Sequence, residues 1–407
     1  MNNLTKLKQL DLSSNKIENL QSSHELLDAL SNLEELYMSK NEVKEIVPIK
    51  NKDNGSLGKL KVARLNSVFT DGTASLIQLL ETFSSVNTLY LSENYFNDTF
   101  STQDQLHGSS KIEELVLDYS SLNNNILQSF GGLASLKALY LGSCGLSTLH
   151  TQGKLETLDL SENSLGGALP SCLANLSSLR YLDISGNQFI GKGASPALAN
   201  LTSLRFMFLS RNLFEVPSIF MSFANHLHLK VLFGDQNKLV REPTIQTWVP
   251  KFQLKAFLFS NCTTKELHIE IPKFLYYQND LSMVDLSYNN FVGKFPFWLL
   301  ENNTRMGAFL MKGNSFMGHL NLPSHPKPKM SIVDISGNKL EGPILASICS
   351  IFPQLKGLNL SDNFFQGNIP PCLGSLNTTY LILDLSHNHL SGGIPEMLAQ
   401  SDSLELL

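Results

Sequence analysis

The chain has 407 residues, of which 42% are hydrophobic and only 16% are charged, so it can bury a large core and is not disordered. The net charge of −5 gives no electrostatic footprint for nucleic acid or for an anionic membrane surface. No run of about 18 apolar residues is present to cross a bilayer, and the opening MNNLTKLKQLDLSS has no apolar stretch that would act as a secretory signal.

A short pattern recurs along the whole chain and first appears as Leu7, Leu10, Leu12 and Asn15, which fit the template L-x-x-L-x-L-x-x-N. The position of the asparagine is called the ladder position below. Asparagine recurs there in further copies, at Asn41, Asn94, Asn163, Asn187, Asn212, Asn237, Asn289, Asn314, Asn338, Asn363 and Asn388. Four weaker copies carry Val68, Ser120, Cys144 and Cys262 instead. These sixteen copies are mostly 24–27 residues apart, and Leu404 opens a seventeenth.

Each copy predicts one short strand, because the two leucines of L-x-L alternate with an outward residue. One coil cannot bury its leucines, whereas stacked coils form a continuous core and a parallel sheet on a concave face. The expected strands centre on residues 10–12, 36–38, 89–91, 158–160, 182–184, 207–209, 232–234, 285, 309–311, 333–335, 358–360 and 383–385, with the weaker copies between them. The remainder of each copy is short enough for a 3-10 or single helical turn. Residues 42–62 contain a polar, glycine-bearing stretch and are expected to loop out.

The ladder asparagine is expected to turn into the core, where its carboxamide satisfies backbone groups of its own coil and of the next coil. Cys144 and Cys262 can do this only weakly, and Val68 cannot, which predicts a local defect there. Several copies continue as G-x-I-P, as in the segment 367–370. The glycine permits a turn with positive φ, and the proline fixes φ where a new extended stretch begins.

The segments LDLSENSLGGALPSCLANLSSL, FPFWLLENNTRM and IPPCLGSL, at residues 158–179, 295–306 and 369–376, resemble the plant-type leucine-rich repeat. Within that group they are similar to the ectodomains of plant receptor-like proteins, which are cell-surface receptors with one membrane span and no kinase. The resemblance implies an α/β solenoid, a horseshoe or superhelix with one parallel sheet on the concave face and short helical turns and loops on the convex face.

Some features of that family are missing from the sequence: the cysteine-bearing N-terminal cap, the island segment, the terminal cap, the membrane span and the cytosolic tail. We therefore expect residues 1–407 to form a single solenoid that is cut within a repeat at both ends. The expected location is the extracellular face of the plasma membrane, as part of a longer parent that supplies the signal peptide and the membrane contact.

The resemblance implies that the parent perceives a ligand, in defence or in development. The implied partners are a peptide, a protein or a cell-wall-derived ligand, together with a co-receptor and without nucleic acid. Three alternatives stay open: a soluble secreted inhibitor of cell-wall-degrading enzymes, which uses the same repeat; a cytosolic repeat protein; and a truncated gene model without a function of its own.

The sequence offers no candidate for catalysis. His387, Asn388 and His389 match the core of a nuclease-like metal motif, but Asn388 occupies a ladder position and no carboxylates accompany the histidines. No glycine-rich phosphate loop, Cys-x-x-Cys pair or nucleophile elbow is present. We therefore expect neither an enzyme nor a bound metal or cofactor.

Two kinds of modification are predicted. Sequons for N-glycosylation begin at Asn3, Asn54, Asn97, Asn175, Asn200, Asn261, Asn302, Asn359 and Asn377. Four of them, at Asn3, Asn175, Asn200 and Asn302, lie twelve residues before a ladder asparagine, on the convex approach to a strand. Cys349 and Cys372 occupy nearly equivalent places on consecutive coils, within the Cα separation that a disulfide needs, although two buried thiols remain an alternative.

Outward strand positions lie six, four and two residues before the ladder position, and most carry Asp, Tyr or a small polar residue. Three consecutive copies instead carry apolar residues there, namely Phe206, Phe208, Val231, Phe233, Ala256 and Leu258, with Arg211 and Asp235 at the edge. They are expected to form an apolar ligand-binding patch with a polar rim. Two alternatives to a binding patch stay open: relaxed constraint on these outward residues, and a loop at 241–250 that folds back and covers them. A second candidate is the interrupted column of Tyr37, Arg64, Tyr90 and Tyr140.

Overall fold

The computed structural model describes residues 6–18, 32–44, 59–72, 74–96, 110–124, 130, 133–148, 154–192, 195–216, 218–241, 248–264, 269–376, 381–399 and 404–406. The chain divides into two compact units. Unit 1 comprises Met1–Ile190 and Pro196–Leu204, and unit 2 comprises Gly191–Ser195 and Arg205–Leu407. The prediction of one continuous solenoid stays a prediction, as does the loop at 42–62, of which residues 45–58 lie outside the described residues.

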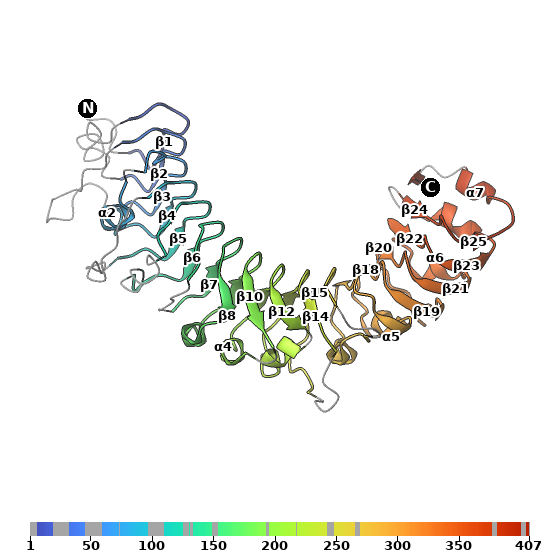
Figure 1. Cartoon of the computed structure of the whole chain (residues 1–407). Coiled ribbons are helices and arrows are strands. Elements are labelled where there is room, and N and C mark those ends of the chain that lie inside the picture. Colours follow the sequence, from blue (N-terminus) through green and yellow to red (C-terminus); the bar gives the residue numbers. More distant parts are fainter. Residues whose placement is uncertain are drawn as a thin grey trace. The chain divides into compact units, whose positions relative to one another are not determined.

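The described part of unit 1 contains eight three-residue strands that pair in parallel with their neighbours (Figure 1). They are β1 (Gln9–Asp11), β2 (Glu35–Tyr37), β3 (Val62–Arg64), β4 (Thr88–Tyr90), β5 (Glu114–Val116), β6 (Ala138–Tyr140), β7 (Thr157–Asp159) and β9 (Tyr181–Asp183). Two further strands, β8 (Gly166–Ala168) and β10 (Gln188–Gly191), pair outside this sheet.

Unit 2 repeats the arrangement with nine strands in its described residues. They are β11 (Phe206–Phe208), β13 (Val231–Phe233), β15 (Ala256–Leu258), β16 (Met283–Asp285), β18 (Ala308–Leu310), β20 (Ile332–Asp334), β22 (Gly357–Asn359), β24 (Leu381–Asp384) and β26 (Leu404–Leu406). Each predicted copy in both units therefore contains a strand. Nearly all of these strands begin one residue before the range in which the strand was predicted to centre.

A second parallel sheet in unit 2 was not predicted. Its strands are β17 (Val292–Lys294), β19 (Ser315–His319), β21 (Lys339–Pro343), β23 (Phe364–Gly367) and β25 (His389–Leu390). It forms where copies continue past the ladder position, and β12 (Leu213–Val216) and β14 (Lys238–Leu239) pair in the same way. The glycine of G-x-I-P has positive φ, as predicted; Gly367, for example, has φ of 81°.

Short helices and 3-10 turns connect the strands, and the longest in the described residues has seven residues. They are α2 (Leu76–Thr82), η3 (Ser171–Asn175) and α4 (Pro196–Ala199) in unit 1, and η4 (Ser218–Phe223), η5 (Lys273–Tyr277), α5 (Phe297–Asn302), α6 (Ile348–Ile351), η6 (Pro371–Ser375) and α7 (Glu396–Ala399) in unit 2. The prediction of 3-10 or single helical turns holds for most of these segments, which have four to six residues, whereas α2, with seven, makes about two turns.

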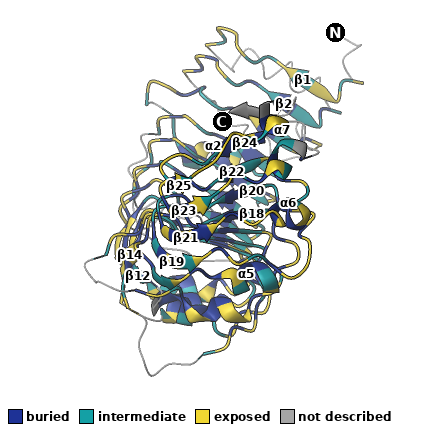
Figure 2. Ribbon diagram, turned by 90° about the vertical axis from the view of Figure 1, so that its right-hand side faces the viewer, coloured by how far each residue is buried: buried dark blue, intermediate teal, exposed yellow. Residues whose placement is uncertain are grey.

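The core of each unit consists of the inward residues of the strands. Leu89, Leu158 and Leu232 are fully buried, and Figure 2 shows buried residues in dark blue. Burial of one such leucine contributes roughly 1.5–3 kcal/mol. The inward leucines therefore hold each coil to its neighbours.

The ladder asparagines bond in one direction along the stack. Asn314 Nδ2 donates to Met311 O of its own coil (3.0 Å) and to Leu286 O of the preceding coil (2.9 Å). Asn314 Oδ1 accepts from Phe291 N of the preceding coil (3.0 Å). The prediction of a hydrogen bond to the next coil is therefore wrong, because the asparagine side chain points towards the preceding coil.

Val68 interrupts this ladder with little local damage. Its side chain is fully buried, and β3 keeps its pairing on both sides. Met38 O still accepts from Asn41 (2.7 Å), and Leu65 O still accepts from Asn94 (2.9 Å). The predicted defect thus amounts to one missing carboxamide: each of the two carbonyls keeps one asparagine donor, and the acceptor that Asn41 provides for Ile17 N has no counterpart at Val68.

The residue before each of the sixteen ladder positions has positive φ. These residues are Ser14, Lys40, Ser67, Glu93, Tyr119, Ser143, Glu162, Gly186, Arg211, Gln236, Asn261, Tyr288, Gly313, Gly337, Asp362 and His387. Only three are glycine, although the left-handed conformation is costly for other residues. At ten of the sixteen positions the residue that follows is a buried asparagine, whose hydrogen bonds hold the turn in place.

Candidate binding surface

The predicted apolar residues of unit 2 lie side by side on the outer face of the parallel sheet. Phe206 pairs in register with Val231 and Phe208 with Phe233, and β13 continues the register to Ala256 and Leu258. We call these six residues the apolar patch. The rings of Phe208 and Phe233 meet edge to face with centroids 5.1 Å apart, an arrangement that favours a fixed aromatic surface.

Strand alternation explains why the patch faces outward. The residue between the two outward positions points inward in each strand, and Met207, Leu232 and Phe257 are fully buried. Phe206 is 40% exposed, while the other five residues of the patch are half-buried by one another. The inward residues therefore fix the fold, and the outward residues remain available to a ligand.

One edge of the patch carries Asp235 and Arg211. Asp235 Oδ1 accepts from Ser260 N (2.6 Å) and Ser260 Oγ (2.9 Å), and Oδ2 accepts from Ser210 Oγ (3.3 Å). These bonds join three consecutive coils, so Asp235 braces this edge. Arg211 is exposed, has φ of 54° and donates its backbone N–H to Asp235 O (2.8 Å).

The opposite edge carries a column of cations that the prediction missed. Arg205, Lys230 and Lys255 each stand one residue before β11, β13 and β15. The missed signal was a basic residue seven positions before the ladder position in three consecutive copies. These cations lie next to the apolar residues, so this edge presents positive charge to a ligand.

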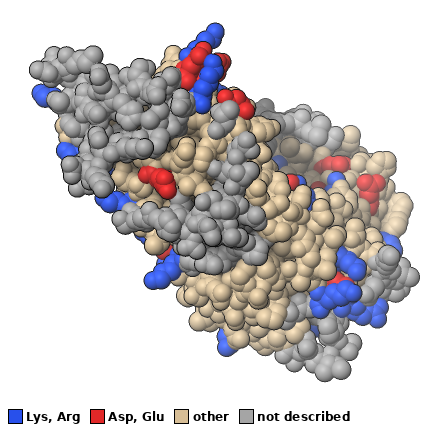
Figure 3. Space-filling view, turned by 60° about the vertical axis from the view of Figure 1, so that its left-hand side comes forward, with Lys and Arg blue, Asp and Glu red and all other residues tan. Residues whose placement is uncertain are grey.

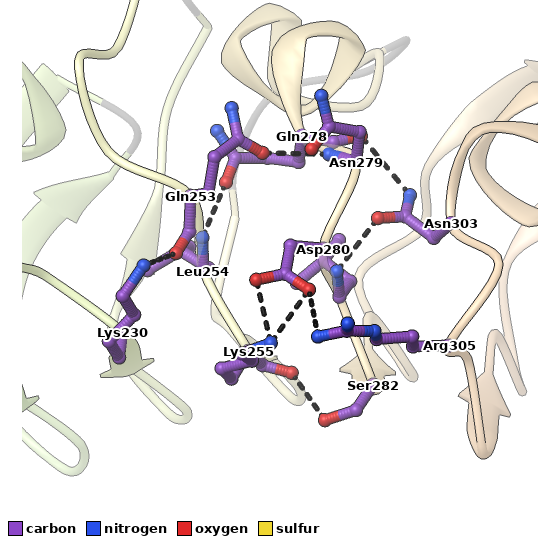
Figure 4. Close-up of polar contacts among 11 residues, drawn as sticks. Lys230, Gln253, Leu254, Lys255, Gln278, Asn279, Asp280, Ser282, Asn303 and Arg305 are labelled. Atoms are coloured by element: carbon purple, nitrogen blue, oxygen red, sulfur yellow. Dashed lines mark hydrogen bonds and ion pairs between the residues drawn. The ribbon is translucent and has the colours of Figure 1, made fainter.

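The cations of this edge differ in how far they are neutralised (Figure 4). Lys255 Nζ forms an ion pair with Asp280 (2.6 Å), which Arg305 also approaches at 3.3 Å. The hydrogen bond from Lys255 lowers the pKa of Asp280, against the opposing effect of burial. Lys230 Nζ instead donates to Gln253 O (3.0 Å), a neutral partner. Along this edge, Arg205, Lys230, Lys255 and Arg305 thus stand against the single carboxylate of Asp280, so the edge keeps a net positive charge.

Amide side chains brace the same edge. Gln253 Nε2 donates to Tyr277 O (2.8 Å), and Gln253 Oε1 accepts from Asn279 N (2.8 Å). The buried Gln278 accepts from Leu254 N through its Oε1 (2.8 Å). Figure 4 shows these contacts joining consecutive coils, so the cations project from a rigid support.

The loop proposed as an alternative cover for the patch lies partly outside the described residues, at 242–247. Trp248, which follows it, stacks on Phe274 (5.7 Å) and tilts against Phe252 (6.2 Å). Both partners are buried, and neither belongs to the apolar patch. The indole therefore packs on the body of unit 2.

The second candidate column lies in unit 1. The Arg64 guanidinium lies 4.3 Å from the Tyr90 ring centroid and 5.5 Å from that of Tyr37, which is a cation–π contact on two strands. Tyr37 Oη donates to Glu35 (2.6 Å), and this bond raises the pKa of Tyr37. Val116 separates Tyr90 from Tyr140 in the register, so the column is interrupted as expected.

Elsewhere in unit 1, charged side chains largely neutralise one another. Glu34 forms ion pairs with Lys61 (2.6 Å) and Lys8 (2.9 Å). The hydrogen bonds from Lys61 and Lys8 lower the pKa of Glu34 to about 2. On the face that Figure 3 shows, charges lie in small groups with uncharged surface between them.

The histidines of the nuclease-like motif serve the repeat. Asn388 Nδ2 donates to Leu360 O and Leu385 O, as a ladder residue does (2.9 and 3.1 Å). The ring of His389 stacks on Phe364 (5.7 Å). In the described residues no group of three His, Cys, Asp or Glu side chains is arranged to hold a metal ion.

The structure joins Cys349 to Cys372 in a disulfide with a Cα–Cα distance of 6.1 Å.

Among the sequons, Asn175, Asn200, Asn261 and Asn302 are exposed. Asn359 is half-buried on β22, where its Oδ1 accepts from Ser361 N (3.0 Å). The sequons at Asn3, Asn54, Asn97 and Asn377 lie outside the described residues. No helix in the described ranges is long and apolar enough to cross a membrane.

Comparisons with known proteins agree with this architecture. Family models described as Leucine rich repeat match residues 3–20, 147–189, 178–201, 354–376 and 381–401. Cuscuta receptor 1 of Solanum lycopersicum is 37% identical over 59% of this chain and 22% of its own length. Receptor-like protein 1 of Arabidopsis thaliana is 35% identical over 54% of this chain and 19% of its own length. The matched part of this chain thus spans about a fifth of these relatives.

Solved structures share the fold. The match to the crystal structure of PEPR1-AtPEP1 includes 100% of this chain and 65% of the solved chain, with a TM-score of 0.64 and 26% sequence identity. The ectodomain of the Arabidopsis receptor kinase HAESA, solved with an IDA peptide hormone ligand, covers 98% of this chain and 81% of that chain. Its TM-score is 0.51 at 22% identity, which shows the common solenoid alone.

Proposed function

Because this chain is a stretch of leucine-rich repeats of the plant receptor-like protein type, we propose that it forms part of a ligand-binding ectodomain at the plant cell surface. The apolar patch is the place where that ectodomain holds a peptide or protein ligand. The parent protein presents it on the extracellular face of the plasma membrane, where signals in defence or development are perceived together with a co-receptor.

One observation carries this proposal: three consecutive strands carry apolar side chains at both outward positions and align them in register, whereas most other coils keep a polar or tyrosine side chain at one of these positions. Strands in a sheet are about 4.8 Å apart, so the patch is about 10 Å across. That width accommodates one or two apolar side chains of a ligand. Such anchors within a polar rim usually dominate the free energy of binding.

The rim specifies the charge of the ligand. Arg205 is exposed, and Lys230 donates to a neutral carbonyl while Asp280, which it also attracts, is already paired with Lys255. Across the patch, the carboxylate of Asp235 is occupied by serines. A ligand with a carboxylate next to its apolar side chain would therefore place that carboxylate at Arg205 and Lys230.

The proposal is tested on the full-length protein with a random peptide library displayed on phage. Enriched peptides are expected to combine apolar side chains with a carboxylate. Phe208→Ser combined with Phe233→Ser should weaken their binding about 30-fold, the effect of losing about 2 kcal/mol at a binding hot spot.

The matched control is Ile332→Ser, because Ile332 is also an outward apolar residue of unit 2 and is 45% exposed. It should leave binding unchanged. The proposal fails if the enriched peptides bind the Phe208→Ser/Phe233→Ser variant as tightly as the unchanged protein while hydrogen exchange shows that the strands remain intact.

A further inference from the structure

An aromatic pair lies partly exposed between the strands of unit 2, where Trp298 is half-buried. The rings of Tyr276, on η5, and Trp298, on α5, are stacked with centroids 4.0 Å apart and planes 21° apart. Tyr276 is 55% exposed, and the adjoining Phe297 is 40% exposed. Figure 2 shows exposed residues, in yellow, on α5. Large rings left in water are unfavourable unless something covers them.

A glycosylation sequon stands next to this pair. Asn302 is the last residue of α5, four residues after Trp298, so the two residues lie on the same face of the helix. Side chains at this spacing have Cβ atoms about 5–6 Å apart. Asn302 is exposed and is followed by Asn303 and Thr304, which complete the acceptor sequence.

The end of α5 is held firmly. Asn303 is fully buried, and its Nδ2 donates to Leu299 O (2.9 Å) and Gln278 O (3.2 Å). Its Oδ1 accepts from Leu281 N of the preceding coil (2.8 Å). Asn302 therefore has a fixed place beside the aromatic pair, while its own side chain remains at the surface.

We propose that Asn302 carries an N-linked glycan whose first sugars cover the Tyr276–Trp298 pair. The C–H face of a pyranose is apolar and matches the face of an aromatic ring, so the contact removes apolar surface of both from water. The hydroxyl groups of the sugars stay solvated and give this side of unit 2 a polar surface. This inference rests on the extracellular placement proposed above and does not depend on the apolar patch.

Two other sequons provide an internal comparison. Asn175 ends η3, and Asn200 follows α4, so both share the phase of Asn302 in the repeat and are exposed. Four residues earlier stand Ser171 and Pro196, which have no aromatic ring. Glycans at these two positions would have no aromatic partner at that spacing.

The first experiment uses the full-length protein secreted from plant cells. Glycopeptide mass spectrometry should find Asn302 occupied, together with Asn175 and Asn200. Peptide N-glycosidase should then release the glycan at Asn302 from the native protein about fivefold more slowly than those at the two other sites. That ratio corresponds to about 1 kcal/mol of protection. In the variant Tyr276→Ser/Trp298→Ser the rates should become equal.

A second variant keeps the rings intact. Thr304→Ala destroys the sequon, and hydroxyl-radical footprinting of this variant should show increased oxidation of Tyr276 and Trp298. Occupied Asn175 and Asn200 with an unmodified Asn302 would overturn this inference alone, as would unchanged oxidation in Thr304→Ala. If none of the three sites were occupied, the extracellular placement itself would be wrong.

Discussion

Two regions of the molecule, β7 and β9 in unit 1 and the apolar patch in unit 2, use the same outward position in different ways. In β7 and β9 of unit 1, Asp159 and Asp183 accept from the backbone N–H of Ser161 and Ser185, two residues later (2.8 Å each). Phe208 and Phe233 occupy this position in β11 and β13 of unit 2 and cannot accept.

After β15 of unit 2, the N–H of the turn is instead satisfied from another coil. Ser260 N donates to Asp235 of the preceding coil (2.6 Å). In the same way, Gly142 N in unit 1 donates to Asp118 (2.7 Å), and Ser92 N donates to Asn66 (2.9 Å). Where the preceding coil supplies the acceptor for the turn N–H, the outward strand residue does not have to be a hydrogen-bond acceptor. This holds for Phe233 and Leu258 of the apolar patch and for Arg64, Tyr90 and Tyr140 of the second column.

The largest effect should separate the two faces of one strand. Leu232→Ala removes a fully buried side chain and should destabilise its coils by about 2–5 kcal/mol. Phe233→Ala, one residue later on the outer face, should cost about 1 kcal/mol, mainly through lost contact with Phe208. Hydrogen exchange of the amides in β11, β13 and β15 measures both locally. Equal losses would show that the patch is part of the core.

A disulfide links two coils of unit 2 that lie outside the apolar patch. Cys349 and Cys372 are 23 residues apart in sequence, and loss of this link should destabilise β20 and β22 by about 3 kcal/mol. Cys349→Ser should therefore raise hydrogen exchange in those strands and leave β11 and β13 unchanged. Cys172→Ser, which alters a cysteine outside the disulfide at the phase of Cys372, is the control and should leave hydrogen exchange in β20 and β22 unchanged.

A double-mutant cycle tests whether the two ways of satisfying the turn are equivalent. Asp235→Ser removes the acceptor of Ser260 N and should cost about 1–3 kcal/mol. Leu258→Asp then provides an acceptor two residues before Ser260, as Asp183 does for Ser185. The double variant should recover part of the lost stability while the apolar patch is destroyed. Purely additive losses in thermal unfolding would refute the exchange.

The smallest effect is a contrast in pH dependence. Burial raises the pKa of Asp183, although the hydrogen bonds from Ser185 act in the opposite direction. The contribution of Asp183 to the free energy of unfolding is therefore present at low pH and declines as pH rises through the raised pKa. The hydrogen bond from Lys255 lowers the pKa of Asp280, so its share is present at neutral pH and declines as pH falls through the lowered pKa.

Asp183→Asn and Asp280→Asn should therefore change the thermal stability with opposite pH dependence. Relative to the unchanged protein, the first variant should gain as pH rises above the usual aspartate range. The second should lose most at neutral pH. Melting temperatures measured across the acidic and neutral range provide the test, and parallel pH profiles for the two variants would contradict it.

The sequence predicted the strands and the apolar patch because both depend on alternation within a few residues. It did not predict that Asp235 would be occupied by Ser210 and Ser260, since those contacts join residues 25 positions apart. The cations at Arg205 and Lys230 were missed for a similar reason. They stand outside the L-x-L pattern, and their importance appears only when coils are aligned in register.

The one-directional asparagine ladder has a consequence for synthesis on the ribosome. Leu286 O receives one bond from Asn289 of its own coil and a second from Asn314, which is translated 25 residues later. At about 5–20 residues per second, a coil waits roughly 1–5 s for the residue that completes it. Each newly made coil thus finishes the bonding of the one already outside the exit tunnel. Ribosome-arrested chains lengthened by one coil should gain hydrogen-exchange protection in the preceding coil first, and protection that began at the newest coil would exclude this order.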